Sequence, residues 1–166
     1  MIPNILVLIV AALIPLVIGF VWYHPKVFGT AWLQHSGLTE EKIKGGNKLL
    51  IFGLSYVMAI LAAIMLYVIV VHQSHFYSLF ADKPDFADPN SDTGKYIAGF
   101  MAEHGHNFRT FTHGLFHGSL AGVLLVTPII AINALFERKS VKYIAINSGY
   151  WLLVLALMGG VIAQFA

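Results

Sequence analysis

The sequence predicts an all-α integral membrane protein: a four-helix transmembrane bundle with short interfacial helices and a long outer loop between the second and third helices. Of its 166 residues, 58% are hydrophobic and only 11% are charged, whereas a soluble domain is typically about 25% charged. Crossing a bilayer takes about 20 apolar residues of helix, and four segments are long enough. They are residues 4–23, 49–71, 109–136 and 143–164. This length leaves room for one bundle, so residues 1–166 are predicted to form a single domain.

The remaining composition argues against several classes of function. Cysteine is absent, which removes disulfides, thiolate metal sites and cysteine nucleophiles. The net charge is only +2 and there is no basic run, so no nucleic-acid partner is expected. Neither a nucleophile–base–acid set nor a phosphate-binding glycine loop is visible, which argues against an enzyme. The expected partners are membrane lipid and either a second copy of the chain, as a homo-oligomer, or another membrane protein.

The first apolar segment is predicted to be a retained helix rather than a secretory signal. A signal has a basic start and a short apolar core, but here no Lys or Arg precedes Lys26 and the apolar run continues to Tyr23. Pro15 cannot donate a hydrogen bond to the carbonyl of Ala11, so a bend is expected inside this helix.

The connections between the long helices are predicted to contain short helices and one long loop. Residues 27–33 place apolar side chains on one helical face, which favours a short helix in the membrane interface with Trp32 at headgroup depth. Thr39 followed by two glutamates is typical of a helix start. The stretch 72–108 is turn-rich and acidic in its middle, with a short amphipathic piece at each end. A connection this long is either functional or disordered.

The distribution of Lys and Arg predicts the orientation in a bacterial inner membrane. Basic residues favour the cytoplasmic side, and most of them lie in the two short links: Lys26, Lys42, Lys44, Lys48, Arg138, Lys139 and Lys142. The opposite side has only Lys83, Lys95 and Arg109, among several acidic residues. We therefore expect both short links in the cytoplasm, and the long loop and both termini outside.

The third apolar segment holds three glycines at four-residue spacing, Gly114, Gly118 and Gly122. Such a stripe lets another helix backbone approach closely, and that neighbour belongs either to the same chain or to a second copy. At 3.6 residues per turn, Asn133 falls within about 60° of Gly118. Its amide is therefore expected on the same helical face as the glycines.

Histidines gather at the predicted outer ends of the second and third helices. The six that share this side are His72, His75, His104, His106, His113 and His117. His113 and His117 project from one helical face about 6 Å apart along the axis, a spacing at which two imidazoles can share a metal. His72 or His75 is the predicted third ligand, and an imidazole-only site suits zinc, copper, nickel or haem iron. The alternative is that these histidines face solvent or form hydrogen bonds across helices.

Polar and aromatic residues form a second group in the predicted cytoplasmic half of the bundle. They are Trp22, Tyr23, His24, Asn133, Glu137, Asn147 and Tyr150. Polar groups at membrane depth must find partners or line a cavity. The group therefore predicts either a pocket for a lipid headgroup or small molecule, or a set of hydrogen bonds that holds the helices together.

Three motifs resemble those of a known bacterial family. The chain has WYHPKVFGTAW after its first helix, NALFERK at residues 133–139 and INSGYW near the start of its last helix. On these motifs it is similar, over nearly its whole length, to the uncharacterised membrane family catalogued as domain of unknown function 1761. The resemblance implies a small polytopic inner-membrane protein, and it implies no particular activity.

Three functions remain open at the level of sequence. The first is a non-enzymatic binding, scaffold or complex-subunit protein of the membrane. The second is a metal- or haem-binding membrane protein that uses the outer histidines. The third is a small transporter that works as an oligomer, because four helices give little room for a transport pathway within one chain.

Overall fold

Four long helical segments form the fold, and each follows one of the apolar runs. The computed structural model describes residues 3–166, which are helical and contain no strand. The segments long and apolar enough to cross a membrane are α1 and α2 (Ile5–Ala11 and Ile14–Trp22), α5 (Lys48–Val70), α8 and α9 (Phe111–Ala121 and Thr127–Phe136) and α10 (Val141–Phe165). The predicted all-α class is confirmed, and every end of these segments lies within two residues of its predicted position.

Two of the four segments are interrupted next to a proline. Helix α1 stops before Pro15, which occupies the first turn of α2, where its missing N–H costs nothing. A π-helical turn, Gly122–Val126, joins α8 to α9 directly ahead of Pro128. The Thr127 hydroxyl donates to the carbonyl of Gly122 at 2.9 Å and so occupies an acceptor within the widened turn. These interruptions are the local response of a helix to a residue that cannot continue its hydrogen bonds.

Helix α10 lies at the centre of the bundle because small residues let α8 approach it closely. A methyl group added at Gly114 would overlap the carbonyl oxygen of Gly159, and one added at Gly118 would overlap that of Leu155. A methyl group at Gly159 would in turn overlap the Gly114 carbonyl. The glycine stripe of α8 therefore faces α10 of the same chain, and each helix contributes glycine to the crossing.

The hydrophobic core lies where α1, α5 and α10 meet. Its largest fully buried side chains are Leu66, Val70, Val71, Val154, Met158 and Ile162. Other large apolar side chains point outward: Phe20, Leu49 and Phe136 are 80%, 86% and 88% exposed. An outer surface this apolar would be costly in water and is suited to lipid.

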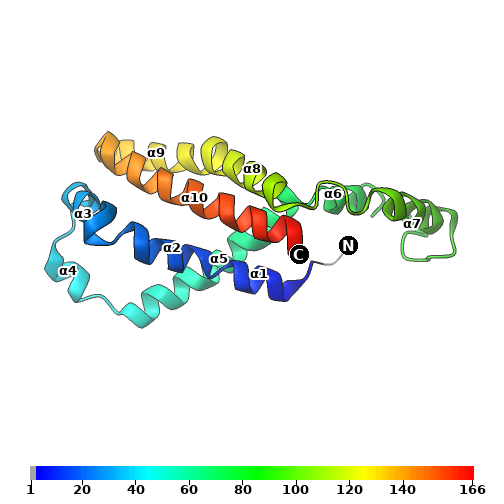
Figure 1. Cartoon of the computed structure of the whole chain (residues 1–166), viewed down its shortest axis with the longest axis horizontal. Helices are drawn as coiled ribbons and strands as arrows, with labels where there is room; N and C mark the ends of the chain where they lie inside the picture. The colour runs from blue at the N-terminus through cyan, green and yellow to red at the C-terminus, as the bar shows by residue number, and fades with distance from the viewer. Residues whose placement is uncertain (1–2) are drawn as a thin grey trace.

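The two short links lie together at one end of the bundle (Figure 1). The first link contains α3 (Thr30–Ser36), and the second is the turn between α9 and α10. The Lys139 ammonium donates to the last carbonyl of α3, and the Ser140 hydroxyl lies 3.0 Å from Nδ1 of His35. These contacts place the two predicted cytoplasmic links side by side.

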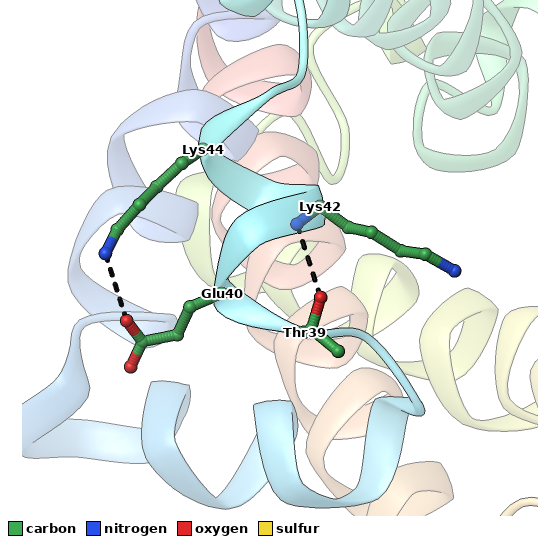
Figure 2. A network of polar contacts seen from close by, with 4 residues as sticks. All are labelled: Thr39, Glu40, Lys42 and Lys44. Carbon is green, nitrogen blue, oxygen red and sulfur yellow. Dashed lines mark hydrogen bonds and ion pairs between the residues drawn. The ribbon is translucent and has the colours of Figure 1, made fainter.

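The first link also contains a π-helical turn, Pro25–Gly29, and a short helix, α4 (Glu40–Lys44). The Thr39 side chain accepts from the backbone N–H of Lys42 at 3.3 Å, and the Glu40 and Lys44 side chains pair at 3.1 Å. Figure 2 shows both contacts. The helix start predicted at Thr39 is confirmed. Because both charged groups are exposed, the ion pair adds little stability.

The long connection between α5 and α8 lies at the other end, beside the start of α1 and the end of α10 (Figure 1). It contains two helices, α6 (Gln73–Ser78) and α7 (Asp92–His104), joined by turns. Arg109 anchors its final residues: Nε donates to the Ala163 carbonyl and Nη2 to the Ala166 carbonyl, both at 2.8 Å. The connection is thereby attached to the C-terminal turn of α10.

Candidate metal centre

Three imidazoles converge at the end of the bundle where α6 and α7 lie. His72 follows the C-terminus of α5. On α8, the Thr110 side chain accepts from the backbone N–H of His113 at 3.3 Å and fixes the first helical turn. His113 and His117, one turn apart, then project from the same face. Because α5 packs against α8, His72 lies opposite that pair.

The three side chains are close enough to act as one ligand set. Nε2 of His72 lies 2.8 Å from Nε2 of His113. The centroid of the His72 ring lies 5.0 Å from that of the His113 ring and 4.9 Å from that of the His117 ring. The centroids of the His113 and His117 rings are 4.4 Å apart. One nitrogen from each ring can be chosen so that all three lie within 4.8 Å of one another.

This spacing fits a tetrahedral transition-metal ion after small side-chain movements. Zinc–nitrogen bonds of about 2.0–2.1 Å at tetrahedral angles place two ligand nitrogens roughly 3.3 Å apart. The His72–His113 pair would therefore open by about half an ångström, and the widest pair would close to the same separation. Rotation of the imidazoles about their side-chain torsions produces movements of this kind.

The protonation state of His72 also favours metal binding. Burial, followed by the neighbouring His117 and His113, lowers the pKa of His72 below its usual value. A neutral imidazole is the form that ligates a metal. Without a metal, the short contact between His72 and His113 is a hydrogen bond that needs one protonated and one bare Nε2.

The other predicted histidines lie outside this group. Within residues 3–166, the close set of metal-ligand side chains contains His72 and not His75, so the structure distinguishes between the two predicted third ligands. His75 is exposed on α6. Nδ1 of His104 lies 3.2 Å from the side-chain nitrogen of Asn107, and His106 is exposed.

Residues that the sequence analysis did not single out surround His72. The Gln73 side chain is only 7% exposed, and its Nε2 donates to the carbonyls of His104 and Asn107 at 3.3 and 2.8 Å. The Phe76 and Phe100 rings stack 4.0 Å apart. The available signal was a second ring four residues after each of these phenylalanines: Phe80 lies just beyond the end of α6, and His104 is the last residue of α7. Side chains at this spacing share one helical face.

Part of the predicted inner polar group does meet, between α2 and α10. The Trp22 indole donates to a backbone carbonyl of α10 at 3.1 Å. The Tyr23 hydroxyl donates to Oδ1 of Asn147 at 2.9 Å, and the Tyr150 hydroxyl donates to the carbonyl of Pro15 at 2.9 Å. Every one of these contacts joins two helices, which is the arrangement expected of polar groups that hold a bundle together.

The remaining members of that group lie apart from it. His24 is exposed, and its Nδ1 accepts from the backbone N–H of Lys26. Asn133 and Glu137 are exposed on α9, whereas Ala134 is buried. The expectation that Asn133 shares the buried face of the glycines is therefore wrong. The π-helical turn ahead of α9 has more residues per turn than an α-helix and shifts the buried position by one residue.

A cavity of about 530 Å³ does open beside this group. Tyr23, Trp32 and Lys44 are among its lining residues. Burial raises the pKa of the Tyr23 phenol well above its usual range, so this group is neutral there. Of the residues predicted to line a pocket for a headgroup or small molecule, only Tyr23 lines this cavity, whose other walls come from residues 25–44.

The fold and the site together define a class of protein: a small helical protein with four segments able to cross a membrane and three converging imidazoles at one end. The chain belongs to the family described as Protein of unknown function (DUF1761), whose family model matches residues 6–163. The match covers nearly the whole chain and confirms the resemblance carried by the sequence motifs. No curated protein and no solved structure matches the chain.

Proposed function

We propose that this protein is an integral membrane protein that binds a divalent transition-metal ion, best fitted by zinc, through His72, His113 and His117. One observation carries the proposal: three imidazole nitrogens, one from His72 just beyond the end of α5 and two from α8, lie within 4.8 Å of one another. A pair on one helix follows from sequence spacing alone, but the third imidazole arrives from another span. Such convergence is what a metal site requires.

The ligand type narrows the choice of ion. Imidazole suits zinc, copper, nickel and iron, whereas magnesium and calcium prefer oxygen ligands. Three protein ligands leave one position of a tetrahedral ion open for water or another molecule. Haem fits this geometry less well, because its flat ring must pass between axial ligands on opposite faces. Here the three rings pack directly against one another, with centroids no more than 5.0 Å apart.

The orientation predicted from Lys and Arg places this site outside the cytoplasm. The cluster lies at the end of the bundle opposite the two basic links, and basic links favour the cytoplasmic side of an inner membrane. In that orientation both termini also lie outside, and the site takes its ion from the external medium. A non-enzymatic binding role accounts for the cluster without a further catalytic group.

Metal analysis and calorimetric titration of detergent-purified protein test this proposal. Wild-type protein, freed of metal by a chelator and then titrated with zinc, should bind one ion per chain. His117→Ala should weaken binding by at least about 100-fold, because losing a ligand costs more than losing a partner that only orients one. His75→Ala is the matched control, since it removes a nearby histidine at the same end and should leave the affinity unchanged.

Two results would contradict the proposal. A wild type without stoichiometric binding would leave the cluster as a hydrogen-bonded contact between α5 and α8. Equal weakening by His75→Ala and His117→Ala would show that the ion binds histidines of this end without the specific three-ligand arrangement.

A further inference from the structure

A cavity of about 350 Å³ lies beside the histidine cluster. Its lining residues include His72, which also belongs to the cluster, and three phenylalanines, Phe76, Phe100 and Phe108. Ligand pockets span about 300–1,000 Å³, so this volume suits a small molecule with one or two rings. Because His72 is common to both, a molecule in the cavity lies next to an ion bound by the cluster.

The cavity walls are aromatic and reach the cluster directly. The Phe76 and Phe100 rings stack nearly parallel, with an interplanar angle of 14°. The Phe108 ring lies 5.0 Å from the His113 ring and 6.3 Å from the His72 ring. Phe108 has a φ of 61°, which a bulky residue rarely adopts. Strained backbone of this kind concentrates at ligand sites, and here it holds an aromatic ring between cavity and cluster.

Hydrogen bonds keep the cavity open in advance of any ligand. The buried Gln73 amide donates to the carbonyl of His104, the last residue of α7, at 3.3 Å and to that of Asn107, three residues further on, at 2.8 Å. Both partners are acceptors, so the amide nitrogen must face them. The start of α6 is thereby fixed to the end of α7. A pocket formed in advance binds with a smaller entropic penalty than one that must be ordered by its ligand.

We propose that the open coordination position of the bound ion takes an oxygen of a small aromatic anion, whose ring occupies this cavity. The inference rests on the proposed metal-binding function. A divalent ion held by three neutral imidazoles keeps its double positive charge, so an anionic donor is favoured at the fourth position. An aromatic ring attached to that donor can pack edge to face or offset against Phe76, Phe100 and Phe108.

Titration of the cobalt-substituted protein with two matched carboxylates tests the inference. Cobalt takes the place of zinc, and its visible absorption reports changes at the open position. Benzoate and acetate offer the same donor and differ in the ring. Benzoate should bind at least about tenfold more tightly than acetate, because only its ring is buried among phenylalanines. In Phe100→Ala the affinities for benzoate and acetate should become nearly equal, while the affinity for cobalt itself stays at the wild-type value.

A second variant protects the test against misfolding of Phe100→Ala. Phe108→Asn removes the exposed ring at a position whose left-handed backbone asparagine adopts readily, and it should also reduce the preference for benzoate. Equal affinities for benzoate and acetate in cobalt-loaded wild type would overturn the inference and leave the metal site intact. A wild type that binds no cobalt would overturn the proposed function itself, and with it this inference.

Discussion

Replacing Gly118 with alanine should separate α8 from α10 and destabilise the bundle. The added methyl group would overlap the carbonyl oxygen of Leu155 and lie close to the neighbouring backbone. A backbone carbonyl in mid-helix cannot swing aside as a flexible side chain can. The two helices must therefore move apart by roughly 1 Å to reach an ordinary carbon–oxygen contact.

The cost follows from the contacts that such a movement weakens. A gap of about 0.5–1 Å forfeits a quarter to a half of the dispersion attraction of each atom pair. The neighbouring crossing of Gly114 and Gly159 is equally tight, so it opens together with the first. Overpacking in a well-packed core costs about 1–3 kcal/mol, and we expect Gly118→Ala near the upper end of that range and Gly118→Leu above it.

The assay is reversible unfolding in mixed detergent, followed by fluorescence of Trp22, Trp32 and Trp151. Gly53→Ala is the matched control, since it makes the same change within α5, where an added methyl group meets nothing within 4 Å. This control should be neutral or slightly stabilising, because alanine favours a helix over glycine by about 1 kcal/mol. If Gly118→Ala were as stable as Gly53→Ala, the proposed tight crossing of α8 and α10 would be wrong.

Three further predictions concern orientation, the inner polar contacts and the metal. Because the chain has no cysteine, Lys83→Cys should react with a membrane-impermeant maleimide on intact cells and Lys44→Cys only after permeabilisation; the reverse pattern would invert the topology. Tyr150→Phe removes the 2.9 Å bond to the Pro15 carbonyl and should cost about 1 kcal/mol, with zinc affinity unchanged; weaker zinc binding would couple the two ends. Zinc at about 100 times its dissociation constant should stabilise wild type by about 2.7 kcal/mol and His117→Ala by no more than about 0.4 kcal/mol, whereas equal stabilisation would place the ion elsewhere.

The sequence predicted the spans well because a bilayer imposes a simple rule on them. Every backbone group inside lipid must be bonded within its own segment, so length and apolar character alone locate the helices. The same reasoning found the glycine stripe, since four-residue spacing keeps Gly114 and Gly118 on one face. It could not say which helix packs against that face. Helix α10 has small residues that allow a close approach, Gly159 among them, but other helices of the chain have small residues too.

The histidine cluster was predictable only in part, for a related reason. His113 and His117 share a helix, and their spacing follows from helical geometry. His72 and His75 were equivalent in sequence because both lie beyond the end of the second span. Which of the two joins the cluster depends on where α5 ends and how it packs against α8, and the tertiary structure determines both. Asn133 shows the same limit, since one wide turn moved it off the buried face.

His72 and His113 form a hydrogen bond when no metal is bound, so the stability lost on replacing His72 should depend on zinc. The hydrogen bond pairs the Nε2 atoms of the two rings, so the metal-free protein leaves neither of these nitrogens unpaired. Losing His72 without metal should then cost only about 1 kcal/mol, the usual net value of a hydrogen bond. With saturating zinc the same variant should also lose the whole stabilisation that comes from zinc binding.

The free energy of unfolding, measured for His72→Ala, His117→Ala and the double variant with and without zinc, separates the hydrogen-bond contribution from the zinc contribution. Without zinc, His72→Ala and the double variant should lose the hydrogen bond, and His117→Ala should not. With zinc, all three variants should lose the linkage contribution once and not twice, because a three-imidazole site fails when any one ligand is lost.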